Sequence, residues 1–314
     1  MATETRATAF VTGAAGFVGS ELIKALVARR HQVFGLTDSL EAAERVRRAG
    51  AQPVMGNLFE PGPWQDQAGA DWVFHVPPHS VPGARVTRRR ISSIARERVQ
   101  SDAHLLDAVA AGPTRRIVYV ADASSYGATQ GQSPITEDAP PQPSSWGLCL
   151  TPALERLDGY IVAGLPIVTA LPAWVYGNGG WFRDRVITPV IGGRRVLVFG
   201  TPGPWVSHVH VVDCARALIH LAERGESSGR YFIVNRDPVH LHDFAQTFAA
   251  LANRPLRVVR VPAVATRLVV GPVLAGHLQA DAVYSNIRLR AIGFRFLYPT
   301  LDQGLRQVLR GFCE

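Results

Sequence analysis

Hydrophobic positions along the chain fall into two alternating patterns, short continuous runs and longer stretches with helical spacing. The first run, 8–11, is followed by three glycines and then by apolar residues that recur at helical intervals up to Arg30. Later segments repeat this succession of apolar runs and helical patterns: 71–76, 93–112, 115–127, 165–177 and 209–225. Strands that alternate with helices in this way predict an α/β fold of the Rossmann type, with a doubly wound parallel sheet.

Three glycines at three-residue spacing, Gly13, Gly16 and Gly19, join the first predicted strand to the first predicted helix. Glycine is needed where a backbone turns sharply and approaches a pyrophosphate without an intervening Cβ. The N-terminus of the following helix supplies amide donors and the positive end of its dipole. Because strand and helix flank the glycines as this chemistry requires, we predict a dinucleotide-binding loop. The other loop residues predicted to contact the dinucleotide are Ala15, Phe17 and Val18.

The second predicted strand ends near Asp38, about 20 residues beyond the glycines. An acid at this point can accept hydrogen bonds from the adenosine ribose, which favours NADH. Ser39, Arg45 and Arg47 lie nearby in the sequence and can receive a 2′-phosphate, so NADPH stays open. Asp38 is equally suited to cap the helix that starts at Leu40.

The composition is that of a globular chain. Hydrophobic residues make up 47% and charged residues 18% of the 314, which is ample for a core and gives no indication of disorder. No apolar run approaches the length needed to cross a bilayer, and the N-terminus lacks the basic and apolar regions of a signal peptide. The three cysteines are scattered without metal-ligand spacing. We therefore expect a cytoplasmic protein with no membrane partner and no metal.

The formal net charge of +8 comes from arginines spread along the whole chain, with no aromatic platforms between them. We therefore expect no nucleic-acid partner. Lys24 is the only lysine in the sequence. It follows the glycine loop on a predicted helix, where we expect it at the surface. Any mechanism that requires a lysine amine must use Lys24 or do without one.

Motifs over essentially the whole chain resemble those of the extended short-chain dehydrogenases/reductases, the group that includes nucleotide-sugar epimerases and plant ketone reductases. The motifs are VTGAAGFVGSEL, GNLFE, DWVFHVPP, ALPAWVYGNGG, WVSHVHVVDCARA and SNIRLRAIGFRFLYPTLDQGL. The resemblance implies a cofactor-binding part, 1–171 and 209–236, and a smaller substrate-binding part, 172–208 and 237–314. It also implies cofactor contacts from Asn57, Leu58, Val76, Pro77 and Pro172.

The chain departs from this family at the catalytic positions. The family's hydroxyl residue is replaced by Asp122, and the positions of its tyrosine and lysine hold Trp146 and Leu150. In the family, the tyrosine donates a proton to the carbonyl oxygen, while the lysine lowers the pKa of that tyrosine and holds the nicotinamide ribose. Loss of a general acid typically costs ~10²–10⁴-fold in rate. Such a loss slows hydride transfer without preventing it, because the cofactor carries the bond-making chemistry.

Three kinds of group can replace the missing proton donor. Asp122 can donate the proton only if burial raises the pKa of its carboxyl group, and it is equally suited to cap a turn. Ser124, Ser125 or Tyr126 can donate directly or through water. Alternatively, the substrate brings its own acid, such as a phenol hydrogen-bonded to the ketone that is reduced.

A flat aromatic substrate suits these departures. Trp146 either offers it an apolar surface or simply fills core volume, and Trp174, Trp181 and Trp205 fall in segments expected to border the substrate. The predicted substrate contacts are Ser124, Tyr126, Trp146, Trp174 and Trp181, and the catalytic candidates are Asp122, Ser124 and Trp146.

We therefore predict an atypical NAD(P)H-dependent ketoreductase that reduces a bulky aromatic, polyketide-like ketone. The composition, rich in Ala, Gly and Pro, is typical of a GC-rich genome and suits an antibiotic-producing bacterium. In lacking the catalytic tyrosine, the chain resembles angucyclinone-type ketoreductases of antibiotic biosynthesis. Two other classes stay open. One is a non-redox isomerase, dehydratase or cyclase that holds the nucleotide structurally. The other is a catalytically silent NAD(P)-binding regulator.

Overall fold

A parallel sheet of seven strands forms the centre of the molecule. The computed structural model describes residues 6–77, 87–110, 112–199 and 203–313. Neighbouring strands follow the order β11-β6-β5-β4-β1-β2-β3, and every pair is parallel. The strands are β1 (Thr8–Thr12), β2 (Gln32–Thr37), β3 (Gln52–Met55), β4 (Trp72–His75), β5 (Arg116–Val120), β6 (Ile167–Pro172) and β11 (Arg230–Ile233). This order confirms the predicted doubly wound α/β fold.

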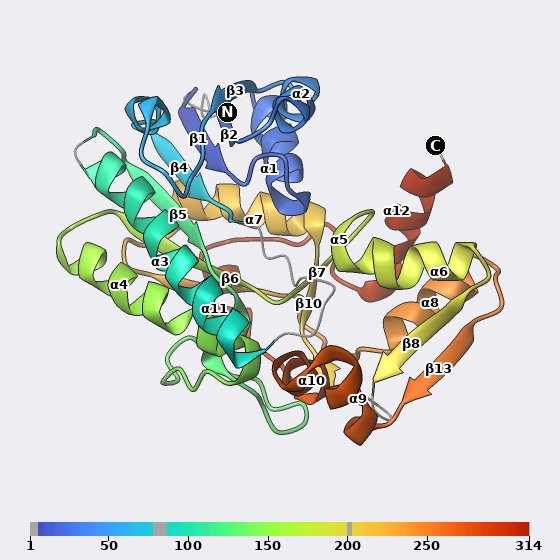
Figure 1. Cartoon of the computed structure of the whole chain (residues 1–314). Coiled ribbons are helices and arrows are strands. Elements are labelled where there is room, and N and C mark those ends of the chain that lie inside the picture. Colours follow the sequence, from blue (N-terminus) through green and yellow to red (C-terminus); the bar gives the residue numbers. More distant parts are fainter. Residues whose placement is uncertain (1–5, 78–86, 111, 200–202, 314) are drawn as a thin grey trace.

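Helices cover both faces of this sheet (Figure 1). One face carries α1 (Phe17–Ala28), α2 (Leu40–Arg48), α7 (Val211–Arg224) and α11 (Ile287–Ala291), and the other carries α3 (Arg88–Ala110) and α4 (Thr151–Val162). Successive strand residues point to opposite faces, so Ala9 and Val11 of β1 join the core under α1 and α7, while Phe10 joins the core under α3. Both faces are buried, which explains why the strands read as continuous apolar runs.

A second group of elements lies beside the sheet, on the right of Figure 1. Its strands form three pairs: β7 (Trp174–Tyr176) with β10 (His208–His210), β9 (Trp205–Val206) with β12 (Val239–His240), and β8 (Arg195–Phe199) with β13 (Arg257–Val261). Its helices are α5 (Gly180–Phe182), α6 (Thr188–Ile191), α8 (Asp243–Leu251), α9 (Ala263–Val270), α10 (Pro272–Gln279) and α12 (Leu301–Cys313), with a π-helical turn, η4 (Arg183–Ile187), between α5 and α6.

An aromatic core holds this second group together. Tyr176, Phe182, Phe244 and Phe248 are fully buried and meet edge to face at centroid separations between 5.3 and 5.9 Å. All members of this core come from 172–208 and 237–314. The division of the chain into two domains at these boundaries stays a prediction. No helix in the described residues is long and apolar enough to cross a membrane.

Two buried histidines of β10 make the stability dependent on pH. His208 and His210 are each 1% exposed, and burial lowers the pKa of each imidazole from 6.5 to about 4. Between these two values the unfolded chain binds more protons than the folded chain, so acid favours unfolding. We expect the free energy of unfolding to fall as the pH drops through this window, on the order of 3 kcal/mol for each histidine.

Urea unfolding near neutrality and at about pH 4.5 measures this loss. A His208→Asn variant provides the control, because it removes one of the two titrating groups and should flatten the dependence. Equal free energies of unfolding at both pH values for the unmodified chain would contradict the expectation.

Candidate active site

The glycine loop closes against the end of the neighbouring strand β4. Gly13 has a φ of +61°, and a Cβ at this position would lie 1.8 Å from the Val76 carbonyl oxygen. A Cβ on Gly19 would lie 2.2 Å from the Gly13 carbonyl oxygen. The Gly16 N–H donates to that same oxygen at 2.9 Å. The tight packing of the loop therefore requires glycine at positions 13 and 19.

The N-terminus of α1 fits an anionic group. Gly16 is its N-cap, with an extended backbone and no side-chain hydrogen bond to the first amides, and the first turn contains no acidic residue. Amide donors at such a helix start, together with the positive end of the dipole, suit a pyrophosphate. The residues present therefore fit the dinucleotide that the loop is predicted to hold. The Phe17 ring packs instead on the turn after β7, where a Cβ on Gly179 would lie 2.6 Å from it.

Asp38 follows β2 with an exposed side chain. Ser39, not Asp38, caps α2, because the Ser39 Oγ accepts the Ala42 N–H at 3.3 Å. The alternative in which Asp38 caps this helix is therefore wrong, and the Asp38 carboxylate is not engaged at the helix start. Arg45 forms an ion pair with Glu41 at 2.8 Å.

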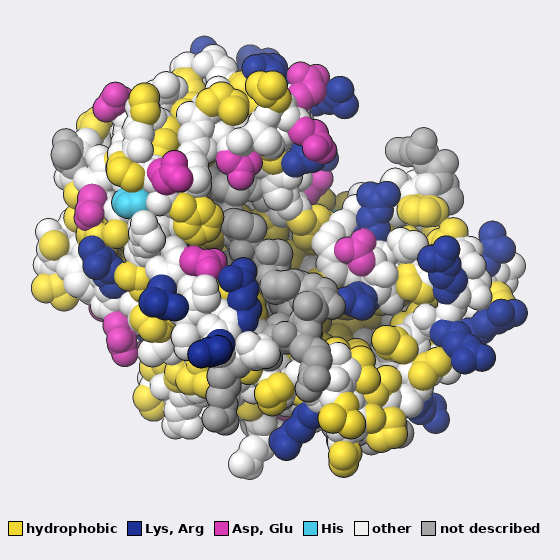
Figure 2. All heavy atoms as spheres, in the orientation of Figure 1, with side chains coloured by type: hydrophobic (Ala, Val, Ile, Leu, Met, Phe, Trp, Pro, Cys, Tyr) yellow, Lys and Arg dark blue, Asp and Glu magenta, His cyan; other side chains and the backbone are white. Residues whose placement is uncertain are grey.

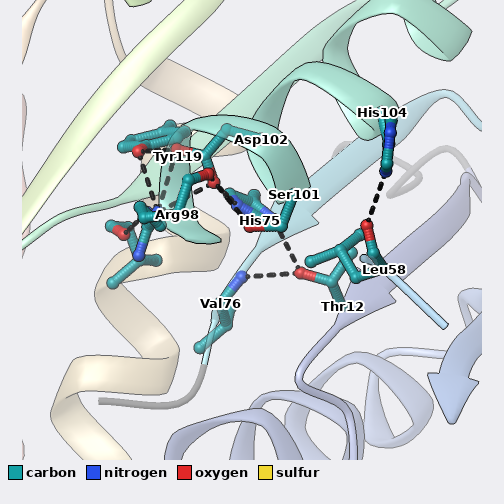
Figure 3. Close-up of polar contacts among 10 residues, drawn as sticks. Thr12, Leu58, His75, Val76, Arg98, Ser101, Asp102, His104 and Tyr119 are labelled. Atoms are coloured by element: carbon teal, nitrogen blue, oxygen red, sulfur yellow. Dashed lines mark hydrogen bonds and ion pairs between the residues drawn. The ribbon is translucent and has the colours of Figure 1, made fainter. Parts of the chain in front are cut away.

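The remaining predicted cofactor residues lie at the carboxyl ends of strands. Asn57 and Leu58 form the turn after β3, where the Leu58 carbonyl accepts the His104 Nδ1–H at 3.1 Å and ties the turn to α3 (Figure 3). Val76 and Pro77 follow β4, and Pro172 ends β6. In open α/β sheets, ligands bind in the crevice outside these strand ends.

A buried polar network lies behind this edge of the sheet (Figure 3). The Val76 N–H donates to Thr12 Oγ1 at 3.1 Å, and Thr12 Oγ1 lies 2.8 Å from His75 Nδ1. The ionised Asp102 carboxylate, which can only accept, faces the other ring nitrogen, so a neutral imidazole carries its proton on Nε2 and Nδ1 accepts from the Thr12 hydroxyl. Nε2 lies 2.7 Å from Asp102 Oδ1 and donates to it. The network thus assigns the tautomer of His75.

Asp102 is the centre of the network. Its carboxylate also accepts from the Tyr119 hydroxyl and from the Arg98 Nε, the latter at 2.9 Å. Arg98 Nη2 donates in turn to the Val120 carbonyl at 3.0 Å. The network therefore connects the ends of β1, β4 and β5 through α3, from the residue before the glycine loop to the end of the strand that precedes Asp122.

Charge and burial keep one anion and one cation in this network. Burial acts to raise the pKa of Asp102, but the Arg98 guanidinium and His75 outweigh it and lower that pKa to about 2. Burial lowers the pKa of His75, against the opposing effect of Asp102. At neutral pH the network holds an ionised Asp102, a charged Arg98 and a neutral His75. Their exposed fractions of 2%, 9% and 0% leave no room for screening by water.

Asp122 caps the short helix η2 (Ala123–Tyr126). Its Oδ1 accepts the Ser124 N–H at 2.8 Å. The capping alternative for Asp122 is thus observed, and a carboxylate that accepts this bond is arranged as an acceptor. The Ser124 Oγ is buried without a partner among the described residues. It lines a pocket of about 20 Å³, enough for one water molecule.

Trp146 and Leu150, predicted to stand at the family's tyrosine and lysine positions, are both buried. They are 6% and 5% exposed, on and just after η3 (Ser145–Cys149), and they pack with Ile91 and Ala95 of α3. Cys149 belongs to the same cluster, and burial, followed by the charge of Asp122, raises the pKa of its thiol to about 12. Trp146 and Leu150 are therefore part of a buried, mainly hydrocarbon cluster.

Trp174 and Trp181 lie together after β6, and the ring of His277 packs against Trp174. Their ring centroids are 5.0 Å apart in an edge arrangement, and His277 of α10 stacks on Trp174 at 5.2 Å with an interplanar angle of 19°. His277 also lines the small pocket next to Ser124. The structure therefore brings Trp174, Trp181 and Ser124 to one region. Trp205 stacks separately on His240.

The Tyr126 side chain is buried, and both its hydroxyl and its ring have contacts within the protein. Its hydroxyl donates to the Glu137 carbonyl at 3.2 Å, and its ring meets Phe232 at a centroid separation of 4.9 Å. The side chain is 3% exposed. Its role as a substrate contact stays a prediction that this geometry does not favour.

His277 was not among the residues predicted from the sequence. It lies in an apolar helix without a chemical motif, far along the chain from Asp122 and Trp174. Burial lowers the pKa of its imidazole, against the opposing charge of Asp122. A neutral imidazole is thus placed beside the pocket, and only the three-dimensional contact with Trp174 reveals it.

Comparison with known proteins places the chain among dinucleotide-dependent enzymes. A family model described as the NAD dependent epimerase/dehydratase family matches residues 9–235. The 4-hydroxy-2-methyl-3-oxo-4-farnesyl-3,4-dihydroquinoline-1-oxide ketoreductase of Stigmatella aurantiaca is 28% identical over 82% of this chain and 77% of its own length. The 3-diazoavenalumate denitrifying reductase of a Streptomyces species is 28% identical over 94% of this chain and 98% of its own length.

Solved structures share the fold. A mutant of the UDP-glucuronic acid 4-epimerase from Bacillus cereus, in complex with NAD and a 4-deoxy-4-fluoro analogue of UDP-glucuronic acid, matches with a TM-score of 0.81. The match covers 96% of this chain and 98% of that one at 17% identity. The match to a family described as NAD dependent confirms the prediction of a nicotinamide cofactor.

Proposed function

Because the chain belongs to the NAD-dependent epimerase/dehydratase family, we propose that it is a reductase that uses NADH or NADPH to reduce a bulky aromatic ketone. The observation that carries this proposal is the burial of Trp146 and Leu150 in an apolar cluster, at the positions where we predict the family's tyrosine and lysine. A site with tryptophan at the position of the family's tyrosine suits a substrate that is protonated by other means. The further assignment to polyketide and antibiotic biosynthesis is part of the proposal.

The strand ends and the glycine loop bind and orient the cofactor in this proposal. The loop and the start of α1 hold the pyrophosphate, Asp38 the adenosine ribose, and Asn57 with Leu58 the adenine. Val76, Pro77 and Pro172 line the nicotinamide side, since they follow or end β4 and β6. When bound, the nicotinamide supplies the hydride. The network around Asp102 keeps Val76 and the residue before Gly13 in fixed positions.

The proton comes from the substrate in this proposal. Three described titratable side chains of this region are poorly suited to donate it. Asp122 accepts a hydrogen bond at a helix start, and Cys149 has a pKa of about 12. The Tyr284 hydroxyl, beside Ser124, already donates to the Gly127 carbonyl at 2.8 Å. His277 is held neutral and is a base in that state. A phenol hydrogen-bonded to the ketone can protonate the alkoxide within the bound substrate. The Ser124 Oγ, which has no partner among the described residues, can hold the carbonyl oxygen.

Aromatic residues support a flat substrate. Trp174 and Trp181 stand next to the pocket that Ser124 and His277 line, and Trp174 follows the end of β6. Aromatic faces at this place suit a polycyclic ketone laid against the nicotinamide. The Stigmatella relative, named as a ketoreductase of a dihydroquinoline oxide, supports an aromatic or fused-ring substrate of this kind.

A second substrate class is favoured by the same lack of a proton donor. The Streptomyces relative is named as a denitrifying reductase of a diazo compound. In our second proposal, an aryl diazonium carbon accepts the hydride and releases dinitrogen, a reaction in which no oxygen needs a proton. Trp146 and Leu150 are as compatible with this acceptor as with a phenolic ketone.

The experiment that tests the leading proposal compares two substrates, of which only one carries a phenolic proton. An aromatic ketone with a neighbouring phenol is offered beside its methyl ether, and oxidation of NADH and NADPH is followed by absorbance. We expect turnover of the phenol and a rate at least ~10²-fold lower for the ether, because the ether has no proton to give. Equal rates would place the acid on the protein.

The same assay separates the other classes. A product formed while the reduced nicotinamide absorbance stays constant identifies a non-redox enzyme with a structural nucleotide. Nucleotide-dependent complex formation without turnover on either ketone or on a diazonium compound identifies a silent regulator. Either result would replace the proposed reductase.

Substitutions at positions 150 and 146 should differ in effect, since the first mainly lowers stability and the second leaves turnover nearly unchanged. Leu150→Lys places an ammonium in a cluster where the wild-type side chain is 5% exposed, and an unpaired charge in such a place costs several kcal/mol of stability, ~3–5 by analogy with broken buried pairs. Trp146→Phe replaces the indole with a smaller phenyl ring and should keep turnover within about threefold, since no proton is donated from position 146. Thermal unfolding and steady-state rates check the two variants; a hundredfold loss in Trp146→Phe would contradict the proposal.

Asp38 should make NADH the preferred cofactor. An exposed carboxylate at the ribose repels a 2′-phosphate, and Arg45 and Arg47 are already near Glu41 and Glu44 at 2.8 and 3.6 Å. We expect NADPH to bind about tenfold more weakly than NADH, and Asp38→Ser to remove most of the difference. Calorimetric titration of both nucleotides measures this. Tighter binding of NADPH by the unmodified chain would show that the arginines dominate.

A further inference from the structure

The outer part of the second group of elements has a net positive charge nearly equal to that of the whole chain. Segments 183–199 and 254–271 contain eight arginines and one acid, Asp184, so their net charge of +7 is nearly the whole +8 of the chain. All eight arginines are exposed. None of them forms an ion pair with a carboxylate in the part of the chain that the structure describes. They are Arg183, Arg185, Arg194, Arg195, Arg254, Arg257, Arg260 and Arg267.

Two of these arginines face each other on a two-stranded parallel sheet. β8 and β13 pair in register, with Arg195 opposite Arg257 and Leu197 opposite Val259. Val196 of β8 packs into the aromatic core, so the alternating Arg195 and Leu197 point outward, where both are exposed. Like charges opposite each other destabilise a sheet, and parallel sheets are normally covered on both faces. This outer face lacks both a counter-charge and a cover among the described residues.

The helix that follows β13 exposes aliphatic side chains and buries a polar one. In α9, Val264 and Leu268 are 82% and 70% exposed, Val269 is 52% exposed, and Arg267 is exposed between them. Thr266 of the same helix is fully buried and satisfies its hydroxyl on the Pro262 carbonyl at 3.1 Å. A surface helix normally buries its apolar side chains and exposes its polar ones, and α9 does the opposite at these positions. Together with β8 and β13, α9 forms what we call the β8–β13/α9 face.

The lower right part of Figure 2 shows this combination on the surface. Hydrophobic side chains gather over α9 and the adjoining elements, Lys and Arg colours surround them, and Asp and Glu colours are nearly absent from that side. The partner of such a face is therefore an anion that also accepts aliphatic side chains.

We propose that the β8–β13/α9 face docks on an anionic lipid surface. Arg195, Arg257 and Arg267 bind lipid phosphates, for which the guanidinium fork is suited. Val264 and Leu268 enter the boundary between headgroups and acyl chains, as aliphatic residues of interfacial helices do. Basic charge and inserted apolar area act together in such binding. The earlier expectation of no membrane partner rested on the lack of a spanning run, which docking does not require.

Two other occupants fit the face less well. A second copy of the chain would bring two strongly positive faces together, and their repulsion opposes association. A nucleic acid would match the charge, but it gives no place for the exposed valine and leucine side chains. The β8–β13/α9 face offers only one aromatic side chain for stacking on bases, the half-buried Phe199. A lipid surface satisfies both the charge and the aliphatic side chains.

Sedimentation of the full chain with vesicles tests the proposal. The probes are vesicles of phosphatidylcholine alone and of phosphatidylcholine mixed with phosphatidylglycerol. We expect partitioning onto the anionic vesicles at least about tenfold above that onto the neutral ones, weakened by added salt. Partitioning that is equal on both, or absent from both, would overturn the proposal, as would capture by a DNA duplex in place of the vesicles.

Matched variants locate the binding surface. Arg195→Glu with Arg257→Glu, and separately Leu268→Asp, should each lower partitioning at least about tenfold. The controls are Arg290→Glu, an exposed arginine of α11, and Ile287→Asp, whose side chain is 69% exposed against 70% for Leu268. Affinity for NADH should be unchanged in all four, which shows that each variant is folded. Equal losses in the control variants would overturn the assignment to this face.

Discussion

Replacing Asp102 with asparagine is expected to lower the free energy of unfolding by about 3–5 kcal/mol, because it leaves the buried Arg98 guanidinium without its counter-ion. The carboxylate accepts from Arg98, His75 and Tyr119 at once, and all of these groups are shielded from water. Asparagine has one acceptor oxygen and offers donors where the network already supplies donors. Denaturant unfolding with constant slope measures the loss.

Two further variants show how much of this loss comes from the uncompensated charge and how much depends on burial of the ion pair. Adding Arg98→Met to Asp102→Asn removes the uncompensated cation, so the double variant should be more stable than the single one. Asp302→Asn breaks an Arg–Asp pair with the same four-residue spacing on α12, at 2.7 Å but exposed, and should leave stability unchanged within error. Equal effects of Asp102→Asn and Asp302→Asn would show that burial does not matter to this network.

Gly13→Ala is expected to weaken NADH binding at least about 100-fold, or about 2.8 kcal/mol. The new Cβ would meet the Val76 carbonyl oxygen at 1.8 Å, in a backbone conformation with a φ of +61°. Neither atom can yield without moving the loop or the end of β4. Because the loop and the end of β4 border the predicted cofactor site, we expect the variant to lose affinity for the cofactor while the fold is kept. Fluorescence or calorimetric titration with NADH gives the affinity.

Gly131→Ala is a matched control for the backbone conformation. Gly131 has a φ of +60°, nearly that of Gly13, but a Cβ there would meet nothing within 4 Å. The variant should lose about 1 kcal/mol of stability from the strained conformation and keep its affinity for NADH. Loss of affinity in both variants would mean that the strain, and not the contact with Val76, is responsible.

The central fold was predictable from the sequence because its signals are local. Gly13, Gly16 and Gly19 sit between an apolar run and a helical pattern, and the doubly buried strands read as continuous hydrophobic stretches. The small sheets were not predictable. β9 and β12 are two residues each, and the pairing of β8 with β13 joins segments about sixty residues apart, a distance over which no local pattern specifies register.

The candidate site was predictable only where a motif carries it. The assignment of Trp146 and Leu150 to the tyrosine and lysine positions rests on the flanking motifs and stays a prediction. Their burial with Ile91 and Ala95 depends on the packing of α3 against η3 and could not be predicted from the sequence. The four-residue spacing of Arg98 and Asp102 was visible in the sequence, and it is typical of an exposed ion pair on a helix. Only the structure shows that this pair is buried beneath the strand ends.

Transfer of label from deuterated NADH tests the central claim most directly. Purified protein, the phenolic ketone and NADH carrying deuterium at either face of C4 are mixed, and the alcohol is analysed by mass spectrometry. The account predicts deuterium on the carbinol carbon from one of the two labelled cofactors, with the side chains of Trp146 and Leu150 in place. An unlabelled alcohol, or no alcohol at all, from both cofactors would contradict it.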